Sequence, residues 1–197
     1  MHMLKYSYIY LVGLVNIFLI PSCRNTHAFD KNIKELDSLN IVVVQAIDNF
    51  RSVDSNNCIL AYQKNTAYGK FLDKNLKDTV NTKTAETLQL FYSTHIGIKN
   101  YIENRGVWLK NATSSRKQLS NLVHDLKNGS IETEEAIGYI TTEKQQAIKI
   151  IEELKKNTEV MRDILDTHAK YTPGVEAFIK SINNGNLPQL QKVSLIK

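Results

Sequence analysis

The sequence has few of the residues that interrupt helices. Glycine occurs only 8 times and proline only 3 times in 197 residues, and one of these prolines, Pro21, lies close to the N-terminus. The chain is rich instead in Lys, Leu and Ile, which favour or tolerate helices. A chain with so few breakers is expected to fold mainly as α-helices.

The sequence also lacks the signatures of several function classes. It has no Gly-x-Ser-x-Gly nucleophile elbow, no glycine-rich phosphate loop and no His-Glu-x-x-His zinc motif. Its net charge is +5, and lysines and arginines alternate with acidic residues rather than gathering in one run. Nucleic-acid binding usually requires a concentrated basic face. We therefore expect a protein that is not an enzyme and does not bind nucleic acid.

The first 22 residues have the pattern of an export signal. Lys5 supplies a positive charge, and residues 6–20 contain no charged side chain. This apolar stretch is about 15 residues long, shorter than the roughly 20 that cross a bilayer as a helix. A basic start, an apolar middle and a small residue before a cut are typical of a secretory signal peptide. The alternative is an uncleaved anchor helix, which would place Pro21 within the membrane.

Residues 19–23, Leu-Ile-Pro-Ser-Cys, resemble the lipobox of bacterial lipoprotein precursors. Pro21 is not the usual residue two positions before the cysteine, and the resemblance covers only the first 23 residues. It implies cleavage between Ser22 and Cys23, a diacylglycerol on the Cys23 thiol and a further acyl chain on the new amine. Two or more chains anchor a protein stably, since each buried CH₂ contributes about 0.8 kcal/mol. With Arg24 next and no acidic cluster, the resemblance favours an outer membrane, on the side that faces the periplasm.

The rest of the chain is expected to form one domain. Removal of residues 1–22 from the chain of 197 leaves 175, about the size of a single domain. We expect residues 23–30 to form a tether and residues 31–197 to form a helical domain. With Cys23 lipidated, Cys58 has no cysteine partner in the chain, which excludes an internal disulfide or a cysteine metal cluster. Such a cysteine is either buried or free to pair with a partner protein, and its apolar neighbours favour burial.

Two helices are predicted in the first part of this domain, because apolar residues recur there every three or four positions. The first extends from about residue 33 to about residue 53. The turn-forming sequence Asp-Ser-Asn-Asn at 54–57 separates it from a second helix at about 58–79. Residues 41–44, Ile-Val-Val-Val, could form a strand alone, but the stripe on both sides favours a helix.

The strongest periodic pattern covers residues 82–170. One apolar stripe extends from Ala85 to Leu126, and another extends from Ala136 to His168. The side chains of such stripes are buried from water only if the stripes face each other or the earlier helices. We therefore expect an all-α fold, an antiparallel helical bundle with a long, coiled-coil-like helical hairpin at 82–170.

The hairpin is predicted to turn at residues 127–130, Lys-Asn-Gly-Ser. Asn and Gly favour the left-handed conformation that commonly ends a helix. With the turn centred near Gly129, residue i faces roughly residue 259 − i. Leu119 would then lie near Ile140, so apolar side chains face each other across the hairpin.

The limits of the two hairpin helices are less strongly marked. The first helix could break between residues 106 and 115, where Ser115 could cap a new helix. The unbroken stripe favours one helix over residues 82–127. Pro173 and Gly174 are expected to end the second helix, and a short helix is predicted at 175–182.

Two histidines on the apolar stripes are the candidate site residues. At the predicted register, His95 faces Ile164, one turn from His168. Two imidazoles across a helix pair could ligate a metal or haem, or act as a pH switch. The sequence has no Glu-x-x-His or His-x-x-x-His spacing to support a ligand set. Two partly solvated histidines near the open end of the hairpin are the simpler interpretation.

Two functions are consistent with these features. The first is a protein-interaction or scaffolding module, anchored to membrane lipid through Cys23 and bound to another protein of the envelope. The alternative is a helical bundle that holds a small molecule, haem or metal between its helices. Aromatic residues that could line such a site are Tyr62, Tyr68, Phe71, Phe91, Tyr92 and Tyr101, although aromatics at these spacings more often fill a core. No cofactor is expected beyond the covalent lipid on Cys23.

Overall fold

The computed structural model describes residues 26–76 and 79–191. Its elements, in chain order, are η1 (Thr26–Phe29), α2 (Asp30–Arg51), α3 (Ser55–Asn75), α4 (Thr82–Asn128) and α5 (Thr133–Ile182). η1 is a short 3₁₀-helix and the others are α-helices, and no strand occurs in the two described stretches. The expected all-α fold is confirmed.

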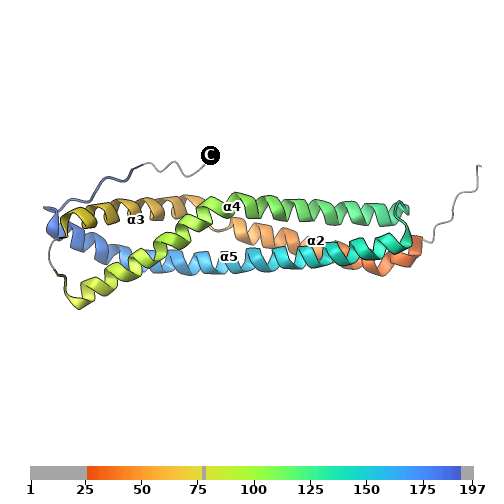
Figure 1. The fold of residues 1–197 in the computed structure, drawn as a ribbon, viewed down its shortest axis with the longest axis horizontal. Helices are drawn as coiled ribbons and strands as arrows, with labels where there is room; N and C mark the ends of the chain where they lie inside the picture. The colour runs from red at the N-terminus through yellow and green to blue at the C-terminus, as the bar shows by residue number, and fades with distance from the viewer. Residues whose placement is uncertain (1–25, 77–78, 192–197) are drawn as a thin grey trace, which may run out of the picture.

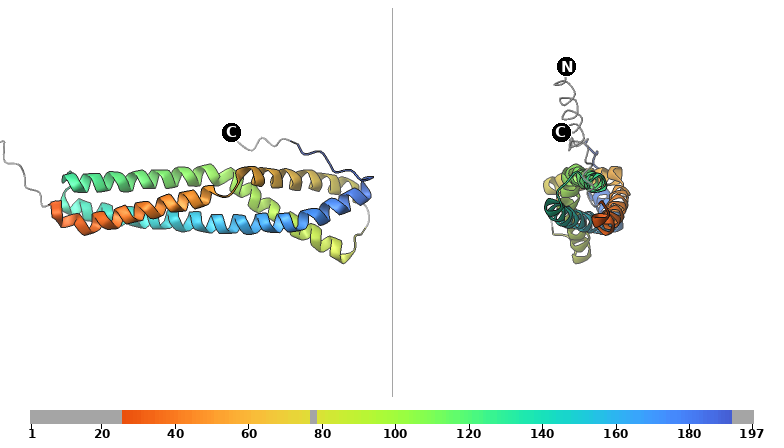
Figure 2. Two further views of the ribbon diagram at one scale, coloured as in Figure 1. Left: turned by 180° about the vertical axis from the view of Figure 1, so that it is seen from behind. Right: turned by 90° about the vertical axis from the view of Figure 1, so that its right-hand side faces the viewer.

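The helices form an elongated antiparallel bundle, or rod (Figure 1). α4, of 47 residues, and α5, of 50 residues, pack along each other over the length of the rod. α2 packs against both of them in one half, and α3 packs against both in the other half. Because α2 and α3 follow each other end to end (Figure 2), each half of the rod packs one of these two helices against α4 and α5.

The two ends of the rod are built from different segments (Figures 1 and 2). The turn end holds η1, the start of α2 and the connection between α4 and α5, at residues 26–33 and 126–136. The open end holds the end of α3, the start of α4 and the end of α5, at residues 72–76, 79–88 and 175–187. η1 contacts α4, and Phe29 packs against the same core as Ile131 at the α4–α5 connection. The described chain therefore enters the rod at the turn end.

The helical domain begins earlier than expected. Within the expected tether at 23–30, residues 26–29 form η1 and Asp30 begins α2. The predicted cleavage and lipidation residues, Ser22 and Cys23, lie outside the described residues. Thr26, the first described residue, follows Cys23 by three positions.

Both predicted turns are confirmed. At the junction of α2 and α3, the Asp54 side chain caps α3 by accepting a hydrogen bond from the backbone N–H of Asn56 at 2.8 Å. At the end of α4, Gly129 adopts the left-handed conformation with a φ of 62°. The backbone N–H of Ser130 donates to the Asp125 carbonyl at 2.9 Å, which satisfies a carbonyl that the helix leaves free.

The preference for a single helix at 82–127 is also confirmed, because α4 continues through the possible break. Ser115 starts no new helix; it is 1% exposed and faces the core. Facing pairs lie close to the predicted register. A Cβ on Gly97 would meet the Ile164 side chain, and one on Gly174 would meet Thr87. Each partner lies two residues from the position that the register predicts.

The prediction that the second hairpin helix ends at Pro173 is wrong, because α5 continues through Pro173 to Ile182. The proline leaves the Ala169 carbonyl without its helical donor, and proline disfavours a helix interior by about 3 kcal/mol. Val175 and Ile179 follow it and are both fully buried. Burying two such side chains contributes roughly 1.5–3 kcal/mol each, which offsets the proline. The hairpin therefore extends to residue 182 instead of ending at 170.

Apolar side chains fill the axis of the rod in two clusters. The main core runs from the turn end past the junction of α2 and α3, and includes Leu36, Val43, Ile98, Leu119 and Leu154. A smaller cluster closes the open end and comprises Tyr68, Leu72, Leu88, Phe91, Val175 and Ile179. Polar side chains also lie between the helices in this open-end half.

Candidate functional site

A cavity of about 460 Å³ lies between α3 and α4 in the open-end half of the rod. We call it the α3–α4 cavity. Its walls combine apolar and aromatic side chains with polar ones from two successive turns of α3. The lining residues are Tyr62, Asn65, Thr66, Gly69, Lys70, Leu72, Asp73, Tyr92, His95 and Ile96.

The best-defined polar group of this cavity is the amide of Asn65, which is 2% exposed. Its Nδ2 donates to the Thr94 hydroxyl at 3.0 Å, and that hydroxyl donates to the Phe91 carbonyl at 2.6 Å. Because a hydroxyl has a single hydrogen, Thr94 can only accept from Asn65. This fixes the orientation of the amide. Asn65 Oδ1 is left as an acceptor with no partner among the described residues.

Two other residues that line the α3–α4 cavity also have a buried polar atom that makes no hydrogen bond within residues 26–76 and 79–191. These atoms are the Thr66 hydroxyl on α3 and the Tyr92 hydroxyl on α4. Burial raises the pKa of Tyr92 far above its ordinary value, and the negative charge of Asp73 adds to the effect. A buried polar group without a partner costs about 1–3 kcal/mol. Three residues that line one cavity therefore each have a buried polar atom without a hydrogen-bond partner among the described residues.

His95 closes one side of the same cavity. Its ring stacks on Tyr62, with ring centroids 4.9 Å apart and an interplanar angle of 17°. Burial lowers the pKa of His95, and the nearby Lys99 lowers it further. His95 is thus held in its neutral form at neutral pH, and it contributes a ring nitrogen that can accept a hydrogen bond.

His168 belongs to α5 and lies against a different face of α3, beside a cavity of about 640 Å³ between α3 and α5. It is 6% exposed, and its ring packs on Phe91 with centroids 4.8 Å apart. Nδ1 lies 3.3 Å from the Thr172 hydroxyl, whereas Nε2 makes no hydrogen bond of good geometry within the described residues. Burial lowers the pKa of His168 to about 4, assisted by Lys64 and opposed by the Ala61 carbonyl.

A polar cluster next to His168 joins α3 to α5. Lys64 Nζ and the Tyr68 hydroxyl both donate to Glu176 Oε1, each at 2.8 Å. Burial alone would raise the pKa of Glu176, but these two hydrogen bonds and the charge of Lys64 outweigh it and lower the pKa. Burial, together with this contact, raises the pKa of Tyr68. These three side chains satisfy one another's hydrogen bonds, so we interpret the cluster as a structural link between α3 and α5 and not as a reaction centre.

The structure does not bring the two predicted histidines into one site. His95 lines the α3–α4 cavity, and His168 lines the cavity between α3 and α5. Among the described residues, no group of three or more His, Cys, Asp or Glu side chains is placed to hold a metal ion. The expected burial of Cys58 is confirmed: it is fully buried, and burial raises its thiol pKa to about 11.

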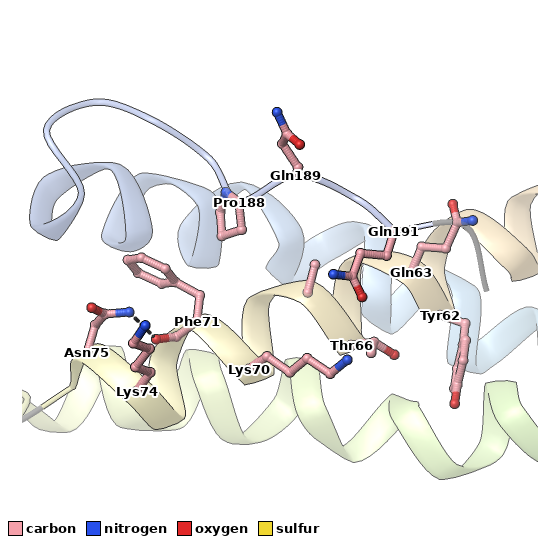
Figure 3. A pocket seen from close by; sticks show the side chains of 11 residues that line it. Tyr62, Gln63, Thr66, Lys70, Phe71, Lys74, Asn75, Pro188, Gln189 and Gln191 are labelled. Atoms are coloured by element: carbon pink, nitrogen blue, oxygen red, sulfur yellow. Dashed lines mark hydrogen bonds between the residues drawn. The ribbon is translucent and has the colours of Figure 1, made fainter.

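The predicted aromatic set divides between core and surface. Phe91 and Tyr68 fill the open-end cluster, and Tyr101 packs in the main core. Tyr62 and Tyr92 line the α3–α4 cavity. Figure 3 shows a neighbouring groove of about 630 Å³, where Phe71 lies beside the segment that follows α5 and Tyr62 is directed toward α4 instead.

Asn65 and Thr66 are site residues that the sequence-based predictions missed. The buried residues of α3 are Cys58, Ala61, Asn65, Tyr68 and Leu72, which recur every three or four positions. Asn65 therefore occupies a core position of the helix. An amide in the middle of an apolar stripe is the sequence feature that could have identified it.

Comparison of the chain with protein-family models, with curated proteins and with solved structures gives no match. Within the described part of the chain, no helix combines the length and apolarity needed to cross a membrane.

Proposed function

We propose that the protein is a lipid-anchored helical rod of the bacterial envelope that acts as a scaffolding module and presents its open end to a partner protein. The observation that carries this proposal is the position at which the chain enters the rod. Thr26 lies at the turn end, and Cys23 precedes it by three residues. Three residues span at most about 10 Å. A lipid on Cys23 would therefore hold the turn end close to the bilayer.

The length of the rod sets how far the open end can reach. A helix rises 1.5 Å per residue, so the 47 residues of α4 span roughly 70 Å. α5 is slightly longer and runs beside α4. If the turn end lies at an outer membrane, the open end can project by this distance into the periplasm.

Contacts along the rod support a stiff spacer. The fully buried side chains Leu36, Leu119 and Leu154 come from three helices and belong to the main core. Lys144 of α5 forms a hydrogen-bonded ion pair with Glu35 of α2. Toward the middle of the rod, Arg162 donates to Asn49 and to Ser52, each at 2.9 Å. α5 is thus held to α2 at more than one level.

The surface proposed to meet the partner lies in the open-end half of the rod. Ile96 is 68% exposed and borders the α3–α4 cavity, and Leu90 in the same half and Leu76 at the open end are also exposed. Single exposed apolar residues are common on any protein. The proposal therefore depends on their position, far from the anchor, and not on their number.

Site-specific photo-crosslinking in intact cells tests this function. A photoreactive residue is placed at Ile96 in the open-end half, or at Ile137 near the turn end, which is 58% exposed and serves as the control. We expect one envelope protein to be crosslinked from position 96 and not from position 137. This crosslink should disappear in Cys23→Ser, which cannot be anchored. Equal crosslinking from both positions, or none from either, would contradict the proposal.

A further inference from the structure

The α3–α4 cavity has hydrogen-bonding capacity that the fold does not use. Asn65 Oδ1 is an amide oxygen and can only accept, while the Asn65 Nδ2 donates to Thr94. The hydroxyls of Thr66 and Tyr92 can each donate one hydrogen bond and accept others. A ligand must therefore bring at least one donor for Asn65, and hydroxyl groups, which both donate and accept, suit all three atoms.

The charges around the cavity favour a neutral ligand. One cation, Lys70, and one anion, Asp73, line it. His95 is neutral, because burial and Lys99 lower its pKa. A charged ligand would lose its hydration on entry without meeting an excess of opposite charge, which is unfavourable.

The size and the walls of the cavity set the scale of the ligand. Its volume of about 460 Å³ lies within the range of roughly 300–1,000 Å³ that is typical of small-molecule sites. Leu72, Ile96 and the ring of Tyr92 supply apolar wall. The Tyr92 ring lies against α3 at Gly69, where a Cβ would be 3.4 Å from Tyr92 Cε1, an ordinary van der Waals contact. Such walls suit the C–H faces of a sugar or polyol ring.

We propose that the α3–α4 cavity binds a small, neutral, polyhydroxylated molecule the size of a monosaccharide, through Asn65, Thr66 and Tyr92. This inference is independent of the lipid anchor and of the partner protein. Buried water could satisfy the same three atoms, and the experiment separates the two cases.

Saturation-transfer NMR on the purified full-length protein tests the site. The probes are D-glucose and myo-inositol, with glucose 6-phosphate and glucosamine as charged controls. A detergent without a sugar headgroup is required, because a glycosidic headgroup would compete for the cavity. We expect both neutral probes to receive saturation and the charged ones to receive less.

Two conservative variants, Thr66→Val and Tyr92→Phe, then remove one unpaired hydroxyl each with little change of shape. Each is expected to weaken binding of the neutral probes by about tenfold, which is about 1.4 kcal/mol. Neither is expected to lower the melting temperature of the free protein, because each removes a buried polar group without a partner. Tyr139→Phe, at a tyrosine that is 52% exposed, is the matched control and should change neither quantity.

The outcomes decide the proposal in both directions. Binding of glucose or inositol that is weakened by Thr66→Val and Tyr92→Phe but not by Tyr139→Phe supports it. No transfer to either neutral probe, preference for a charged probe, or binding that both variants leave unchanged would overturn it. A lowered melting temperature in the two variants would show that the hydroxyls serve water-mediated stability instead.

Discussion

His168 should make the stability of the rod depend on pH in a range where most carboxylates are still ionised. The imidazole is buried between α3, α4 and α5, against Phe91 and beside Thr172. The charged groups that influence it are Lys64 of α3, which disfavours the imidazolium, and Glu176 of α5, which favours it. Burial is the largest effect, and the pKa falls from 6.5 to about 4.

The sign of the effect follows from this depressed pKa. Below about pH 6.5, His168 is protonated in the unfolded chain, whereas in the folded chain it stays neutral until about pH 4. The free energy of unfolding is therefore highest above the unfolded pKa and falls as the pH drops. A single group with these two pKa values loses about 2 kcal/mol of stability between about pH 7 and about pH 5.

Urea unfolding followed by circular dichroism at these two pH values measures the loss. We expect wild type to lose about 2 kcal/mol more than His168→Gln. His95 contributes in the same direction in both proteins, because its pKa is also lowered. His124→Gln is the control, since His124 is exposed and should leave the difference unchanged. Equal pH dependence in wild type and His168→Gln would refute the account of a neutral, buried His168.

Two further substitutions and one labelling experiment test the fold. Leu154 is 1% exposed, so Leu154→Ala should lower the free energy of unfolding, measured by chemical denaturation, by about 2–5 kcal/mol. Val160 is 47% exposed, so the control Val160→Ala should have little effect. Gly129→Ala should lower the melting temperature through a loss of about 1–2 kcal/mol, because the φ of Gly129 is 62°. Cys58 should react with a thiol reagent at neutral pH only after unfolding, because it is fully buried and its pKa is about 11; rapid labelling of the native protein would contradict this.

Much of the fold was predictable from residues that end helices and from the spacing of apolar side chains, because both features act between residues that are close together in the sequence. Gly129 ends α4 since the left-handed conformation suits glycine, and the stripe from Ala85 to Leu126 fixes a continuous helix. Pro173 shows where such features fail. Its effect on the helix is local, but burial of Val175 and Ile179 against other helices outweighs it.

The candidate site depended on tertiary packing and was only partly predictable. His95 and His168 lie near each other in the hairpin register, but α3 packs at this level of the rod and the two side chains line cavities on different faces of it. The importance of Asn65 depends on its hydrogen bond to Thr94, which is 29 residues away in the chain. No periodicity in the sequence could show that contact.

The most direct test of a rod anchored at its turn end is a comparison of two positions relative to the bilayer. A fluorophore is attached at Glu134→Cys in the turn end or at Ser181→Cys in the open end, in lipidated protein reconstituted into vesicles that carry a quencher on the lipid headgroups. The two positions are 47 residues apart on α5, or roughly 70 Å. We expect strong quenching at 134 and none at 181. Equal quenching at both positions, or none at either, would contradict an anchored, projecting rod.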